Sequence, residues 1–81
     1  MKIIRVDNRN IISLENVRRV RLAVEETNHT RCGKRYTIMH YSIRIMYKNN
    51  DVESIDCGED MTGKEFSETT MEKIFNILEE D

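Results

Sequence analysis

The chain has 81 residues, with 13 Lys and Arg against 15 Asp and Glu, two Cys, and neither Pro nor Trp. This length predicts a single domain over residues 1–81, because cores divide only in much longer chains. No apolar run approaches the roughly 18 residues of a membrane-spanning helix, and the N-terminus lacks the long apolar stretch of a signal peptide. We therefore expect a cytoplasmic protein without a membrane segment.

The first quarter of the chain predicts short extended segments joined by turns. Apolar residues indicate a strand near residues 2–6 and a second extended segment at residues 11–14. The Asp-Asn-Arg-Asn cluster at residues 7–10 is typical of a turn, because Asn and Asp tolerate positive φ. We expect Glu15 and Asn16 to kink the chain before the next strand.

Two longer strands are predicted in the middle of the chain. Residues 17–26 alternate between apolar and polar positions, which indicates a half-buried strand. The polar residues 27–35 contain a glycine and predict an exposed loop. The clearest alternation follows it: Tyr41, Ile43 and Ile45 share one face, whereas the intervening positions, among them Arg44, are mostly polar.

A turn at residues 49–51 predicts a hairpin between this strand and residues 52–57. A three-residue loop places Ile45 opposite Ile55 and Arg44 opposite Asp56, whereas a two-residue loop would turn Ile55 to the polar face. We therefore predict the three-residue loop, with Asp51 in the left-handed position of a bulged turn.

The C-terminal segment predicts a helix. Thr62-Gly63-Lys64-Glu65 has the spacing of a capping box. The residues that recur at helical spacing define the face expected to be buried: Phe66, Thr70, Met71, Ile74, Phe75, Ile77 and Leu78. Strands precede this helix and none follow it, so it packs across one face of the sheet. The predicted fold is α+β, an antiparallel meander of about four strands with one C-terminal amphipathic helix.

Opposite charges are concentrated in the two parts of the chain. Residues 1–48 hold 11 basic and 4 acidic side chains, and residues 49–81 hold 2 basic and 11 acidic ones. The simplest explanation is internal complementarity, in which basic strands lie beside an acidic strand and helix. The alternatives are an acidic partner for the basic face and self-association between the acidic helix of one copy and the basic sheet of another.

From this pattern we predict a small non-enzymatic module for protein interaction, most simply a homo-oligomer, since a domain of this size gains stability by association. The candidate surface is the polar face of the sheet, where two apolar residues stand among arginines: Arg19, Arg21, Ile38, Arg44 and Met46. The alternative is a nucleic-acid-binding module that uses Arg18, Arg19, Arg21, Arg44 and residues 31–35.

Residue types that carry metal or thiol chemistry are few. His29 and Cys32 have ligand-like spacing, but His40 and Cys57 are isolated and do not form the second pair typical of zinc sites. Basic neighbours favour a reactive thiol at Cys32, yet a polar loop does not hold a nucleophile and a base in place. We expect no metal, no cofactor and no catalytic residue.

Ile11-Ile12-Ser13-Leu14-Glu15-Asn16-Val17, followed by a Tyr-Ser-Ile-Arg-Ile strand, a turn and a helix, resembles small bacterial proteins of unknown function. These proteins share a strand, an Ile-x-Leu-(Asp/Glu)-Asn-(Val/Ile) segment, a meander and a final amphipathic helix. The resemblance covers most of the chain except residues 29–35. It implies the same fold and carries no functional residue.

Overall fold

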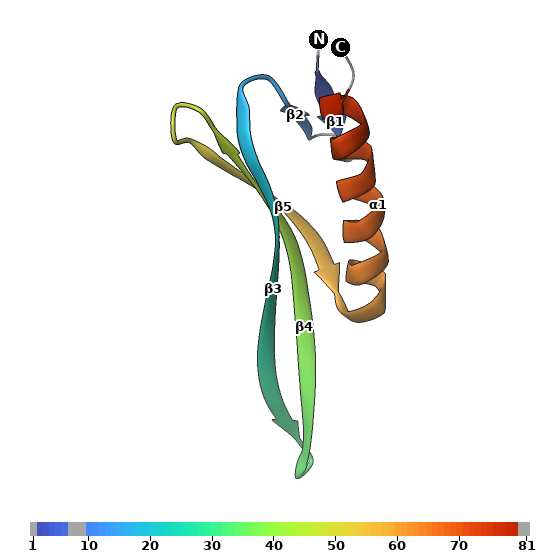
Figure 1. Cartoon of the computed structure of the whole chain (residues 1–81). Helices are drawn as coiled ribbons and strands as arrows, with labels where there is room; N and C mark the ends of the chain where they lie inside the picture. Colours follow the sequence, from blue (N-terminus) through green and yellow to red (C-terminus); the bar gives the residue numbers. More distant parts are fainter. Residues whose placement is uncertain (1, 7–9, 80–81) are drawn as a thin grey trace.

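A computed structural model describes residues 2–6 and 10–79 (Figure 1). The predicted turn at residues 7–10 lies mostly outside this range. The described elements are β1 (Ile3–Arg5), β2 (Ile11–Ser13), β3 (Val17–Arg31), β4 (Lys34–Tyr47), β5 (Val52–Glu59) and α1 (Asp60–Glu79). No described helix combines the length and the apolar character needed to span a membrane.

The fold class predicted from the sequence is confirmed: antiparallel sheets and one C-terminal helix form an α+β domain. The strands divide into two sheets, a two-stranded β1-β2 sheet and a three-stranded sheet of order β3-β4-β5. The predicted kink before β3 is also present, since Asn16 has a φ of 60°. The helix lies on one side of the larger sheet, and no described helix or strand covers the other side of that sheet (Figure 1).

β3 and β4 form a hairpin that projects far beyond the rest of the molecule. β5 pairs with β4 only between His40 and Met46, so residues 26–39 continue as an uncovered two-stranded ribbon, which we call the arm (Figure 1). The arm gives the molecule its extents of 53 × 24 × 22 Å. The predicted loop at residues 27–35 is therefore wrong: apart from the turn at Cys32 and Gly33, these residues are paired strands.

A two-residue turn at the tip explains why the arm is a ribbon. Arg31 lies opposite Lys34, and Cys32 and Gly33 between them have φ values of 52° and 75°. Two consecutive positive φ values are typical of the type I′ turn, whose twist matches that of the flanking strands. Asn-Gly is the usual sequence for this turn, so the Cys-Gly sequence did not predict it.

We expect Cys32→Asn to stabilise the arm by about 1 kcal/mol. The left-handed conformation costs an ordinary residue about 1–2 kcal/mol, and asparagine adopts it more readily. Amide hydrogen exchange in the arm should become about fivefold slower, because the arm opens locally without the rest of the domain. The control Gly33→Ala should accelerate exchange, since no atom crowds this site and only the positive φ opposes a side chain. Unchanged exchange in Cys32→Asn would contradict the turn assignment.

The predicted register between β4 and β5 is wrong by two residues. Ile43 lies opposite Ile55 and Arg44 opposite Ser54, rather than opposite Cys57 and Asp56. The connecting loop has three residues, as predicted, because the Tyr47 amide donates to the Asp51 carbonyl at 2.9 Å, but it spans residues 48–50 and its left-handed position is Asn50 (φ 73°), not Asp51. A shift of two residues keeps every side chain on its face, so the hydrophobic pattern alone does not distinguish the registers. The ladder shifts again between Tyr41 and Ser42.

The helix begins at Asp60, directly after β5 and two residues before the predicted cap at Thr62. Asp60 has a φ of 53°, which turns the chain from strand to helix without a loop. Its carboxylate Oδ1 accepts a hydrogen bond from the Met39 amide at 3.1 Å. Asp60 therefore ties the start of α1 to the base of the arm, at the point where β5 ends.

The core lies between the larger sheet, the helix and the small β1-β2 sheet. Its buried apolar residues are Ile4, Leu14, Ile43, Ile45, Ile55, Cys57 and Ile74. The helix contributes a stripe whose residues grow in size along it: Gly63, Ser67, Thr70 and Ile74. Figure 1 shows α1 and β5 meeting at one end and diverging toward the end where β1 and β2 lie. Small residues therefore occupy the narrow end and isoleucine the wider part.

The buried helix face was only partly predicted. Thr70 and Ile74 are buried, and Met71, Ile77 and Leu78 are half-buried against the core. Phe66 and Phe75 were expected in the core, but they are 39% and 44% exposed. The close approach at the start of α1 has no room for the ring of Phe66, whereas Phe75 lies farther along the helix, beside the buried Ile74 and toward β3.

Candidate interaction surface

The candidate residues from the sequence all lie on the side of the β3-β4-β5 sheet that faces away from α1, which we call the open face. Antiparallel partners share a face, and Ile43 and Ile45 face the helix. Arg44 and Met46 therefore point to the open face. The register then places the remaining three residues on the same face: Arg19 opposite Met46, Arg21 opposite Arg44, and Ile38 opposite Thr27.

Arginines form a cluster at the centre of the open face. Arg21 and Arg44 are direct cross-strand partners, and Arg19 precedes Arg21 by two residues on the same strand. Arg18 joins them through hydrogen bonds from its guanidinium to Asn50 Oδ1 (3.3 Å) and Met46 Sδ (3.1 Å). Side chains directly opposite each other in a sheet have their Cβ atoms about 5 Å apart. The positive charges of Arg21 and Arg44 therefore repel each other, which destabilises the isolated domain.

No carboxylate of the described residues forms an ion pair with this cluster. Within residues 2–6 and 10–79, the one ion pair joins His40 Nδ1 and Glu59 Oε1 at 3.6 Å. Asp56 lies opposite Ser42 rather than Arg44 because of the register. Internal complementarity was the simplest explanation of the opposed charges, and the described side chains form no arginine–carboxylate contact that would support it.

The open face continues onto the arm as a polar strip. Thr27 Oγ1 lies 3.0 Å from His29 Nε2 and 3.1 Å from His40 Nε2, so one hydroxyl joins both rings. The His29 ring stacks on Tyr36, with ring centroids 5.3 Å apart and an interplanar angle of 18°. Residues 27–39 include no acidic side chain, and their basic residues lie at the tip: Arg31, Lys34 and Arg35.

The four candidate metal and thiol residues do not form one cluster: His29 and His40 share the Thr27 hydroxyl, whereas the two cysteines lie elsewhere. Cys57 is buried in the core, Cys32 is exposed at the tip of the arm, and both are free thiols. Burial, assisted by the charge of Asp56, raises the pKa of the Cys57 thiol. No three His, Cys, Asp or Glu side chains of the described chain form a group suited to a metal ion.

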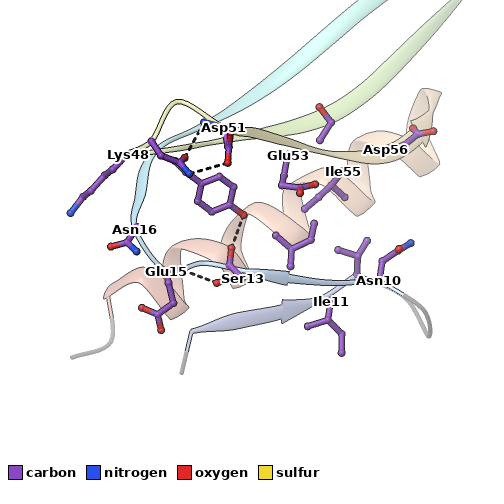
Figure 2. A pocket seen from close by; sticks show the side chains of 15 residues that line it. Asn10, Ile11, Ser13, Glu15, Asn16, Lys48, Asp51, Glu53, Ile55 and Asp56 are labelled. Carbon is purple, nitrogen blue, oxygen red and sulfur yellow. Dashed lines mark hydrogen bonds between the residues drawn. The ribbon is translucent and has the colours of Figure 1, made fainter.

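A groove of about 1070 Å³ lies on the other side of the sheet, between β2 and β5 (Figure 2). The Tyr47 hydroxyl donates to the Ser13 carbonyl at 2.6 Å and bridges its two walls. Burial, with the nearby negative charge of Glu53, raises the pKa of Tyr47. Among the described residues, several carboxylates and one cation, Lys48, line the groove, and none of the candidate residues from the sequence does.

Two features of the surface were not apparent from the sequence. The direct Arg21–Arg44 opposition depends on the β3–β4 register, which is set by the turn at Cys32 and Gly33. The polar residues 27–35 of the arm predict a loop, although the threonines and Tyr36 of the arm are typical of strands. The arm has no core to face, so neither of its sides is predominantly apolar. The alternation of apolar and polar residues that indicates a half-buried strand is therefore missing, and periodicity did not predict these strands.

Comparisons with protein-family models, with curated proteins and with solved structures found no match for this chain. A function must therefore be inferred from the geometry of the surface itself.

Proposed function

We propose that this protein is a small non-enzymatic protein-interaction module that binds an acidic protein surface through the arginine cluster of its open face. The observation that carries the proposal is the direct opposition of Arg21 and Arg44 without a carboxylate partner among the described residues. An isolated domain gains nothing from this arrangement, whereas a bound carboxylate accepts charge-assisted hydrogen bonds from the guanidinium groups. Ile38 and Met46 add apolar contact on the same face. The free thiols support a reducing compartment, and we propose the cytoplasm as the place of action.

The variant Arg44→Glu should gain stability and lose binding. Exchanging a like-charge pair for an opposite-charge pair across β3 and β4 should raise the free energy of unfolding by about 0.5 kcal/mol, measured with urea. Binding of a labelled oligoglutamate peptide, measured by fluorescence anisotropy, should weaken at least about tenfold, because a buried or shared guanidinium contact contributes on the order of 1.5–3 kcal/mol.

The control for this experiment is Lys73→Glu. Lys73 is exposed on α1, on the opposite side of the sheet, and the substitution makes the same change in net charge. Its peptide affinity should stay within a factor of about two or three of the parent protein, because an exposed charge remote from the site contributes little. Equal losses in the two variants would mean that only overall charge attracts the peptide, and a destabilised Arg44→Glu would contradict the repulsion between Arg21 and Arg44.

The arm supports a second candidate, nucleic-acid binding. A projecting ribbon with three basic residues at its tip and a stacked His29–Tyr36 pair resembles the combination of cationic and aromatic groups that binds phosphates and bases. Random single-stranded and duplex oligonucleotides in the same anisotropy experiment, at about 50 and 200 mM salt, test it. Duplex binding that exceeds peptide binding and falls by about 10³-fold or more between the two salts would favour this candidate.

A further inference from the structure

The outer edge of β3 is long and has no partner in the described chain. β3 is the first strand of the β3-β4-β5 order, so one of its sides pairs with β4 and the other is free. Among the described elements, only β4 forms backbone hydrogen bonds with residues 18–31. Long uncovered edges are templates for another strand, and proteins usually block them with prolines or bulges. Here the chain has no proline, and the one irregularity in the described β3 lies between Val17 and Arg19.

The groups that face this free edge can be assigned from the hairpin. Residues that flank a two-residue turn form a hydrogen-bonded pair, and such pairs recur at every second position. The Arg31–Lys34 pair therefore directs the odd-numbered residues of β3 toward β4. The even-numbered residues, among them Val20, Leu22 and Val24, direct their N–H and C=O groups outward.

The same three residues carry an apolar stripe: Val20 is half-buried against the core, and the helix leaves Leu22 and Val24 uncovered. Val20, Leu22 and Val24 lie opposite Ile45, Ile43 and Tyr41, so they share the helix side of the sheet. α1 packs over β4 and β5, and Leu22 and Val24 remain 37% and 47% exposed. An apolar stripe beside free backbone groups needs a partner strand that is itself apolar on one side.

We propose that a second copy of this chain fills this edge, with the two β3 strands antiparallel about a two-fold axis at Leu22. The symmetry places Leu22 opposite Leu22 of the second copy and Val20 opposite Val24 of the second copy. On the open face, Arg19 lies opposite Glu25 of the second copy, so both copies gain an opposite-charge pair. Apolar side chains therefore meet apolar ones, and arginine meets glutamate.

Neighbouring registers lack this self-complementarity. Centring the axis on Arg21 places this arginine opposite itself, and centring it on Val24 places Leu22 opposite Glu26. Centring it on Ala23 retains an Arg21–Glu25 pair but places Val20 opposite Glu26. Only the axis at Leu22 combines an unbroken apolar stripe with a charge pair, and it forms one continuous six-stranded sheet with both helices on the same side.

Sedimentation of the full-length protein tests the proposal. The parent protein should sediment as a dimer and Leu22→Glu as a folded monomer, because the symmetry places two glutamates opposite each other. Val52→Glu is the matched control, since Val52 is an exposed apolar residue on β5, away from this edge, and should leave the dimer intact. A monomeric parent protein, or a dimeric Leu22→Glu, would overturn the proposal.

Charge reversal and crosslinking test the register. Arg19→Glu and Glu25→Arg should each weaken the dimer at least about tenfold, and the double variant should recover most of the affinity. In a Cys32→Ser background, Leu22→Cys should form a disulfide-linked dimer under mild oxidation, because hydrogen-bonded partners have Cα atoms about 5.5 Å apart. Ala23→Cys should not. Crosslinking through Ala23 instead, or no recovery in the double variant, would overturn the axis at Leu22.

This inference does not rest on the proposed function. Leu22 lies on the helix side of the sheet, whereas Arg21 and Arg44 lie on the open face, and the two surfaces share only Arg19. A monomeric Leu22→Glu variant that still binds the oligoglutamate peptide would show that the two surfaces act separately. A parent protein that forms the dimer but does not bind the peptide would support the dimer and contradict the proposed function.

Discussion

Replacing Gly63 by alanine is expected to destabilise the domain by about 2 kcal/mol, although alanine is the better helix former. A Cβ at residue 63 would collide with the Gly58 carbonyl oxygen and lie 2.5 Å from its carbon, in the first turns of α1. Helix propensity alone would favour alanine by about 1 kcal/mol. Overpacking costs about 1–3 kcal/mol, and here the obstacle is backbone, which no side-chain rotation relieves.

Urea unfolding measures this effect, with Gly33→Ala as the comparison. Gly33 has a positive φ, but no atom lies within 4 Å of the position that an alanine methyl group would take. Its substitution should therefore cost only about 1 kcal/mol, from backbone strain. A cost at Gly63 clearly above that of Gly33 is expected. Neutral or stabilising behaviour of Gly63→Ala would mean that α1 and β5 separate freely, and would contradict the wedge-shaped packing of the two elements.

The closeness of α1 to β5 is also where prediction from the sequence was least successful. Helical periodicity located the helix and its inward positions beyond residue 69, yet it selected Phe66 and Phe75 for their hydrophobicity and passed over Gly63 and Ser67. Hydrophobicity does not report the distance between elements. That distance is set by the direct passage from β5 into α1 at Asp60, which leaves no loop to separate strand and helix.

The faces of the sheet were predictable because alternation in β4 is strong. Ile43 and Ile45 are buried and Arg44 is exposed, as their positions indicated. The partners across each strand were not predictable, because shifts of two residues preserve the faces. The arginine cluster was thus foreseen as a shared face, whereas the direct opposition of Arg21 and Arg44 required the structure.

Replacing Ile74 by alanine should cost about 3–4 kcal/mol, a large part of the stability of a small domain. Ile74 has no exposed surface and is the one large side chain of α1 in the fully buried core. It lies where the wedge between helix and sheet has widened enough for a branched side chain. Truncation to alanine leaves a cavity. The helix is held in place at Gly63 and the strands beneath it are paired, so neither can move to close the cavity, and its full cost to the free energy of unfolding should remain.

Phe75→Ala is the matched comparison, because Phe75 is the next residue, is larger, and was predicted from periodicity to lie on the same face. Phe75 is 44% exposed, and it borders a separate pocket that residues 17–20 of β3 also line, rather than the core. Its truncation should therefore cost about 1 kcal/mol or less in urea unfolding, despite the greater volume removed. Comparable losses at the two positions would mean that α1 is rotated about its axis, with Phe75 turned inward, and would contradict the small-residue stripe through Gly63 and Ser67.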